Sequence, residues 1–184
     1  MANNRDDIIL EIVLLLLKEK IHLRSIARKL EIHHSIIARK LKELINENVV
    51  DYNLEGKNKV FYIKNNIQAK NYVYNAERYK LIKLCRKYPE LTIIIEDILK
   101  ISREKMIILF GSYAKFSPKK ESDIDLYIET KNSKVKEEIN SINSKIKVKI
   151  GIFNINDLLI TVIIKNHIIL RGVEEFYEKN KFFK

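Results

Sequence analysis

A glycine-serine step and two aspartates lie within twenty residues of one another, in the stretch "LFGSYAKFSPKKESDIDLYI", Leu109–Ile128. The apolar run Met106–Phe110 predicts a buried strand, and Gly111-Ser112 interrupts it. If a helix opens at Ser112, its free backbone N–H groups, its positive dipole end and the serine hydroxyl would together bind a phosphate group. We therefore predict a phosphate-binding turn at Gly111 and Ser112.

Asp123 and Asp125 lie on one face of the strand that follows. The segment Ser122–Thr130 alternates polar and apolar residues, as a half-buried strand does. Two like charges side by side repel each other, so the pair indicates a bound cation, and hard oxygen ligands beside phosphates suit Mg²⁺. The predicted chemistry is phosphoryl or nucleotidyl transfer.

This stretch resembles the signature of the DNA polymerase β-like nucleotidyltransferase superfamily in its minimal form, Gly-Ser followed by ten residues and Asp-x-Asp. The segment "NHIILRGVEEFYE" is also similar to the usual ending of these domains, so the resemblance covers roughly residues 105–184. It implies a small mixed sheet flanked by helices, and ATP or another NTP as substrate. It further implies that Gly111 and Ser112 contact the nucleotide phosphates, while Asp123 and Asp125 bind Mg²⁺ and are catalytic.

Lys149 departs from the family pattern, because a third carboxylate is usual at its place in a later strand. Within Lys145–Phe153, alternation puts Lys149 on the polar strand face, where it is either a solvated side chain or one that reaches the nucleotide or the metal-binding aspartates. Glu129 is a poor replacement acid, since it lies about 13 Å along the strand from Asp125. Asp157 is another poor replacement, since it follows the end of its strand.

The missing acid bears on activity, because the third carboxylate of the family helps to hold a second metal ion and activates the attacking hydroxyl. Nucleotide binding without turnover is therefore an alternative to catalysis. Phe116, which stands where the family usually has glycine, is a smaller departure and is expected to reshape the loop before Ser117-Pro118.

The N-terminal residues predict a winged helix-turn-helix: an apolar helix, two more helices separated by residues 31–33, and two short strands joined through Gly56. The third helix carries a polar stripe that could enter a DNA major groove. Lysines at the wing tip would contact phosphates. The predicted DNA-binding residues are Ser35, Arg39, Lys42, Lys57 and Lys59. The alternative is a solvated helix face in a protein-interaction domain.

The predicted fold class is α+β, in three parts: a winged helix-turn-helix at 1–65, a helical linker at 66–101 and a nucleotidyltransferase-like domain at 102–184. The net charge of +11 and the pI of about 9.5 agree with a polyanionic partner such as DNA. The single cysteine, Cys85, excludes an internal disulfide. The four histidines are expected at the surface or in helix caps. No membrane span or secretory signal is predicted, so the expected location is the cytoplasm.

Two functions are consistent with these observations. In the first, the protein transfers AMP from ATP to a protein hydroxyl. The chain here resembles minimal nucleotidyltransferases that act as antitoxins of HEPN-domain toxins, and this resemblance implies a toxin partner. The winged helix would then bind DNA as a homodimer and repress the operon that encodes the protein. In the second, the protein is a DNA-binding regulator whose degenerate nucleotidyltransferase domain senses nucleotides.

Overall fold

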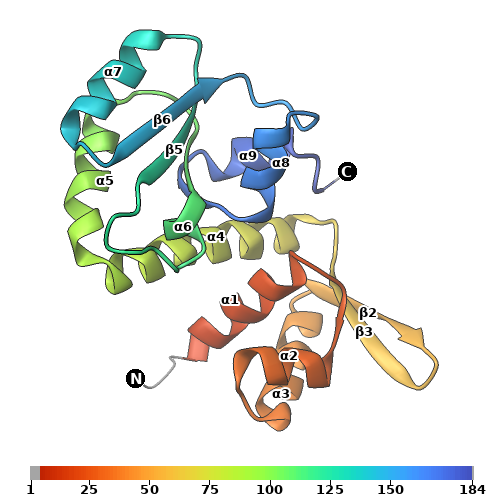
Figure 1. Cartoon of the computed structure of the whole chain (residues 1–184). Helices are drawn as coiled ribbons and strands as arrows, with labels where there is room; N and C mark the ends of the chain where they lie inside the picture. Colours follow the sequence, from red (N-terminus) through yellow and green to blue (C-terminus); the bar gives the residue numbers. More distant parts are fainter. Residues whose placement is uncertain (1–4, 184) are drawn as a thin grey trace. The chain divides into compact units, whose positions relative to one another are not determined.

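The computed structural model describes residues 5–183, which form two compact units (Figure 1). The first unit extends to Ala76 and includes Phe183, and the second comprises Glu77–Phe182. The division falls inside helix α4 (Ile67–Lys87), so this helix contributes residues to both units. No helix within residues 5–183 is long and apolar enough to cross a membrane.

The first unit contains three helices and a small antiparallel sheet, followed by the start of α4. The strands lie in the order β1-β3-β2, and β2 and β3 form a hairpin whose turn contains Gly56 at φ +60°. In chain order the elements are α1 (Arg5–Leu16), β1 (Ile21–His22), α2 (Leu23–Leu30), α3 (His34–Asn46), β2 (Val50–Glu55) and β3 (Asn58–Ile63).

The turn between α2 and α3 follows from local backbone chemistry. Helix α2 ends at Glu31, which adopts a left-handed conformation at φ +56°, and the backbone N–H of Ile32 donates to the carbonyl of Ala27. Helix α3 then starts after His33, whose ring nitrogen accepts from the backbone N–H of Ser35, the capping role expected for this histidine. The apolar faces of both helices are buried, with Ile26, Ile37, Leu41 and Leu44 in the core.

The second unit is a four-stranded mixed sheet with helices around it, in agreement with the expected α+β class. The strand order is β6-β5-β4-β7; β5 and β6 are parallel, and the other pairs are antiparallel. After the end of α4 the elements are α5 (Pro89–Ile101), β4 (Ile107–Phe110), α6 (Gly111–Ala114), β5 (Ile124–Glu129), α7 (Ser133–Ile142), β6 (Ile146–Gly151), α8 (Leu158–Lys165), β7 (Ile168–Arg171) and α9 (Val173–Lys179).

One face of this sheet is covered by α5 and α7, and its core includes Leu91, Ile95, Leu126, Ile139 and Val148. Helix α5, in the segment expected to act as a linker, is thus part of the core of the second unit. On the opposite face of the sheet, a row of packed aromatic rings covers one end of the sheet. The rings of Tyr127 and Phe153 lie 6.2 Å apart, and those of Phe153 and Phe176 of α9 lie 5.5 Å apart. At the other end of this face, where β5 begins, Asp125 stays partly accessible.

Candidate active site

The turn after β4 brings the glycine-serine step against the second aspartate. Phe110 pairs with Asp125 across the sheet, and Gly111 follows at φ +72°. A Cβ atom on Gly111 would lie 2.1 Å from Oδ2 of Asp125, closer than any two such atoms approach. Only glycine fits here, because it tolerates the positive φ and leaves room for the carboxylate. The predicted phosphate-binding turn and the predicted metal-binding pair therefore lie in one place.

The two aspartates differ in environment. Asp123 precedes β5 and is exposed, whereas Asp125 lies in the strand and is half-buried. Burial raises the pKa of the Asp125 carboxyl, the negative charge of Asp123 raises it further, and the ammonium of Lys149 opposes both effects. A cation between the two carboxylates would relieve this repulsion.

Phe116 lies at the end of the same turn, and the backbone conformation at this position explains why glycine is usual there. Its φ is +56°, in the left-handed region that non-glycine residues avoid. Its ring packs against the core, and its carbonyl accepts from the ammonium of Lys87 at 3.0 Å. The ammonium groups of Lys83 and Lys87 lie 5.8 and 5.7 Å from the ring centroid.

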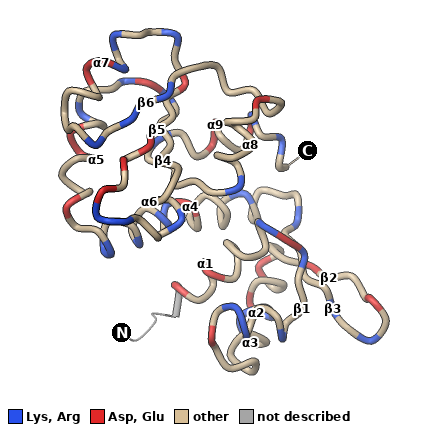
Figure 2. Tube along the Cα trace, in the orientation of Figure 1, with Lys and Arg blue, Asp and Glu red and all other residues tan. Residues whose placement is uncertain are grey.

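Strand β6 lies beside β5 and presents Lys147 and Lys149 on the accessible face, and Lys145 directly precedes the strand. In the strand register Asp125 pairs with Lys147, and Tyr127 pairs with Lys149. Blue segments follow β6 next to the red segments at the start of β5 (Figure 2). Lys149 is a predicted site residue and Lys147 is not. Their alternation in the sequence places both on one face, but only the strand register shows that Lys147 is the direct neighbour of Asp125.

The three lysines are not equivalent. The ammonium of Lys145 donates to the carbonyl of Lys120 at 2.9 Å and lies 4.0 Å from the Glu121 carboxylate, so it holds the loop before β5. Lys147 and Lys149 are exposed, and within residues 5–183 neither forms an ion pair or a hydrogen bond through its ammonium. They are therefore available to a ligand.

The two other acids considered as a third carboxylate have structural roles. The Glu129 carboxylate accepts from the backbone N–H of Phe153 at 3.1 Å and forms an ion pair with Lys179. Asp157 caps α8, accepting from the backbone N–H of Leu159 at 2.7 Å. Over the described part of the chain, His, Cys, Asp and Glu side chains form no group of three or more that could hold a metal ion.

The donor set fits one Mg²⁺ ion bound together with a nucleotide. Mg²⁺ in such sites takes one or two carboxylates, with substrate phosphates and water completing its shell. Asp123 and Asp125 supply two carboxylates next to the turn at Gly111. A second ion would need the third carboxylate of the family pattern, and the strand next to Asp125 carries ammonium groups instead.

In the first unit, the predicted DNA-binding residues lie on accessible surfaces: Ser35, Arg39 and Lys42 are exposed on α3, and Lys57 and Lys59 are exposed at the β2–β3 turn. The ammonium of Lys59 lies 4.0 Å from the centroid of the Tyr52 ring. An open hollow of about 490 Å³, which was not predicted, is lined by Arg24, Arg28 and His34 among others. The i, i+4 spacing of the two arginines on α2 was the signal for it.

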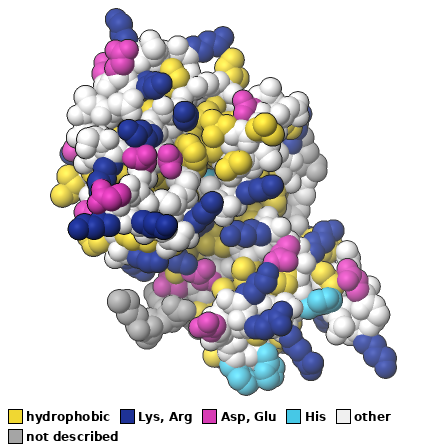
Figure 3. Space-filling view, viewed as in Figure 1, with side chains coloured by type: hydrophobic (Ala, Val, Ile, Leu, Met, Phe, Trp, Pro, Cys, Tyr) yellow, Lys and Arg dark blue, Asp and Glu magenta, His cyan; other side chains and the backbone are white. Residues whose placement is uncertain are grey.

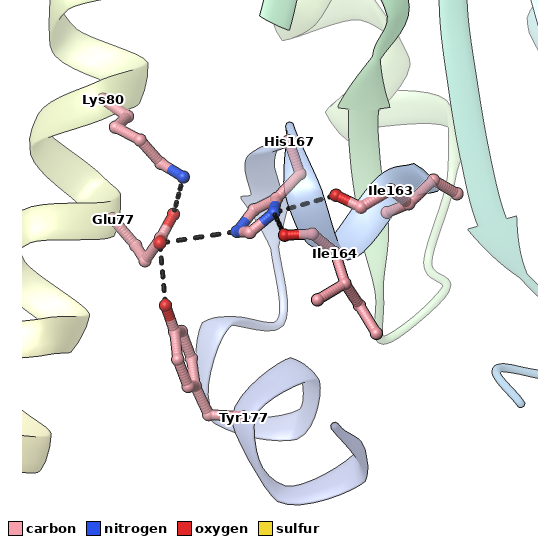
Figure 4. Close-up of polar contacts among 6 residues, drawn as sticks. All are labelled: Glu77, Lys80, Ile163, Ile164, His167 and Tyr177. Atoms are coloured by element: carbon pink, nitrogen blue, oxygen red, sulfur yellow. Dashed lines mark hydrogen bonds and ion pairs between the residues drawn. The ribbon is translucent and has the colours of Figure 1, made fainter. Parts of the chain in front are cut away.

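A buried polar cluster joins α4 to the end of α8 and to α9 inside the second unit (Figure 4). The Glu77 carboxylate lies 2.6 Å from the ammonium of Lys80, accepts from the Tyr177 hydroxyl at 2.8 Å and lies 3.4 Å from Nε2 of His167. Nδ1 of His167 faces the carbonyls of Ile163 and Ile164, so both of its nitrogens face acceptors. The expectation of a surface or capping role was wrong for His167, which is buried because this carboxylate and the Phe176 ring enclose it.

The fold and the paired aspartates define a nucleotidyltransferase domain, and comparison with known families agrees. The family model described as "Polymerase beta, Nucleotidyltransferase" matches residues 80–180. The chain therefore belongs to the polymerase beta nucleotidyltransferase family. No curated protein and no solved structure matches the chain.

Proposed function

We propose that the protein is a Mg²⁺-dependent nucleotidyltransferase that moves AMP from ATP to an acceptor. The observation that carries this proposal is the close approach of Gly111 to the Asp125 carboxylate, which only a glycine permits. It joins a turn suited to phosphates to a carboxylate suited to Mg²⁺, the two groups that nucleotidyl transfer requires in one place.

Each residue has a distinct task in this proposal. Backbone N–H groups at Gly111 and Ser112, with the serine hydroxyl, hold the triphosphate. Asp123 and Asp125 hold Mg²⁺, which would polarise the phosphoryl oxygens. The ammonium of Lys149 offsets negative charge at Asp125 and at the phosphates. The acceptor that the resemblance implies is a hydroxyl on a protein partner, a HEPN-type toxin, and a toxin gene next to this one would support that assignment.

ATP binding is expected to depend on both Mg²⁺ and Asp125. We expect titration calorimetry to show binding of Mg²⁺-ATP that weakens strongly when Mg²⁺ is omitted, since the triphosphate would then face two unneutralised carboxylates. Asp125→Asn should weaken Mg²⁺-ATP binding by about ten- to a hundredfold, the loss of one charge-assisted contact. Asp97→Asn, on the exposed side of α5, is the matched control and should bind as the parent does. Undiminished binding by Asp125→Asn would remove this residue from the metal site.

A second function is proposed for the first unit, as a winged helix-turn-helix that binds DNA. The element order α1-β1-α2-α3-β2-β3, with its small antiparallel sheet, supports this assignment. The exposed polar side of α3 suits a major groove, and Lys40 of the same helix takes no part, because it is buried and paired with Glu43 at 2.8 Å. Arg24 and Arg28, in the hollow beside α3, would add phosphate contacts. If the second unit binds a nucleotide without transferring it, the protein would be a nucleotide-sensing, DNA-binding regulator.

Replacement of Arg39 or Lys42 by alanine is expected to weaken DNA binding. Fluorescence anisotropy with a duplex from the region upstream of the gene should show losses of about five- to a hundredfold for a base contact. A lost phosphate contact should also lower the slope of log K against log salt by about one. Lys136→Ala, at an exposed position of α7 in the second unit, makes the same change in net charge and should leave binding unaltered. If both α3 variants bind as the control does, the groove assignment is wrong.

A further inference from the structure

Within residues 5–183, the strands on the accessible face of the sheet present no free base to an acceptor hydroxyl. A neutral hydroxyl must lose its proton as it attacks, and a group within hydrogen-bond reach must take that proton. Asp123 and Asp125 are committed to the metal in the proposed site, Glu129 is tied to Lys179 and Phe153, and Asp157 caps a helix. The histidine of this unit, His167, is enclosed in the buried cluster.

The same face offers two exposed ammonium groups that form no ion pair or hydrogen bond within residues 5–183. Lys147 and Lys149 alternate along β6, so their Cα atoms are about 6.6 Å apart and both side chains point away from the core cluster. Figure 3 shows Lys and Arg side chains gathered around a few acidic ones over this part of the second unit. Two ammonium groups at this spacing can hold one dianion between them.

We propose that the acceptor is a phosphate monoester, held by Lys147 and Lys149, and not a neutral hydroxyl. The proposal rests on the proposed nucleotidyl transfer and names a different acceptor class from the protein hydroxyl that the family resemblance implies. An anionic oxygen of the monoester bonds to the α-phosphorus of ATP. The bond from that phosphorus to the oxygen bridging to the β-phosphate breaks, and diphosphate leaves with the electron pair. The product is a phosphoanhydride, and no proton has to be removed from the acceptor.

Charge distinguishes this acceptor from other ionisable ones. A phosphate monoester carries close to two negative charges at pH 7, which matches two ammonium groups. A carboxylate carries one charge, and a phenol with a pKa near 10 is protonated at pH 7 and would need the base that this face lacks. Lysines in place of a third carboxylate are thus the change that an anionic acceptor requires, because a carboxylate there would repel it.

Direct binding is the first test, and it needs neither nucleotide nor metal. Titration calorimetry with ribose 5-phosphate and with ribose compares the same sugar with and without the dianion. The parent protein should bind the phosphate and not the sugar, and Lys147→Gln and Lys149→Gln should each weaken binding about tenfold or more. Lys134→Gln, an exposed lysine on α7, is the matched control and should bind as the parent does. Equal affinity in all four proteins would overturn the proposal.

Transfer is the second test, with ATP labelled at its α-phosphate, Mg²⁺ and a panel of acceptors. Ribose 5-phosphate and a 5′-phosphorylated oligonucleotide separate a small phosphate ester from a polymer end; ribose, a 5′-hydroxyl oligonucleotide, acetate and N-acetyltyrosine are the comparisons. Label on either phosphate acceptor, lost in Lys147→Gln and Lys149→Gln, supports the proposal. Label on a hydroxyl, carboxylate or phenol in preference to the phosphates overturns it and leaves nucleotidyl transfer standing. Absence of Mg²⁺-ATP binding would overturn both.

Discussion

Gly111→Ala is expected to abolish Mg²⁺-ATP binding and to destabilise the second unit. The new Cβ would lie 2.1 Å from Oδ2 of Asp125, so either the Asp125 carboxylate must rotate away from its place or the turn at Gly111 must shift. A positive φ at alanine adds about 1–2 kcal/mol of backbone strain. Either shift disturbs a metal ligand or the phosphate-binding turn, and each charge-assisted contact contributes about 1.5–3 kcal/mol, so titration calorimetry should find Mg²⁺-ATP binding about a hundredfold weaker or more.

Gly151→Ala is the matched control for this substitution. Gly151 ends β6, two residues after Lys149, and a Cβ there would meet nothing within 4 Å. Its thermal unfolding and its Mg²⁺-ATP affinity should therefore match those of the parent protein. Parent-like nucleotide binding by Gly111→Ala would show that the turn is not the phosphate-binding element.

Glu77→Gln is expected to be the most destabilising single substitution of a charged residue in the second unit. The side chain of Glu77 is 1 % exposed and faces Lys80, His167 and Tyr177. Removal of its charge leaves a neutral amide facing the ammonium of Lys80 and Nε2 of His167, and breaking a buried ion pair typically costs about 3–5 kcal/mol. Chemical denaturation should show this loss, while Glu137→Gln, at an exposed position of α7, should change the free energy of unfolding by less than about 0.5 kcal/mol. Equal stability of the two variants would contradict the account of the cluster.

The same cluster predicts how stability varies with pH. Burial by itself raises the pKa of Glu77. Electrostatic interactions and hydrogen bonds with His167 and Lys80 outweigh the effect of burial and bring this pKa down to about 2. A carboxyl whose folded pKa lies below its unfolded value of 4.5 stabilises the fold above pH 4.5, and this contribution is lost as the pH falls towards 2. Unfolding midpoints measured from pH 6 to pH 2.5 should fall more steeply in the parent than in Glu77→Gln. Parallel curves would contradict the assignment.

The parts of the site that depend on local sequence could be predicted. The apolar run before Gly111 and the alternation around Asp125 indicate a strand, a turn and a second strand, because each pattern reflects burial of its own residues. Phe116 could be flagged only as unusual; its positive φ, which explains the glycine usual there, is visible only in the structure.

The parts that depend on contacts between distant segments could not be predicted. Nothing near Lys147 in the sequence says that β6 lies parallel to β5 with this residue opposite Asp125. Tyr177 and Glu77 are 100 residues apart, and Glu129 and Lys179 are 50 apart, so these pairings arise from the topology of the sheet and its helices. The sequence around His167 gives no sign of its contact with Glu77, so this histidine has the features of an ordinary surface residue.

The fate of the individual phosphates of ATP tests the central claim most directly. The protein is incubated with Mg²⁺, the acceptor panel and ATP labelled either at the α-phosphate or at the γ-phosphate, and the products are separated. Nucleotidyl transfer predicts that the α label enters the acceptor product while the γ label leaves in diphosphate. It also predicts that Asp125→Asn abolishes the labelling of the acceptor and the release of diphosphate. Appearance of the γ label on the acceptor, with the α label retained in ADP, would show phosphoryl transfer and contradict the account.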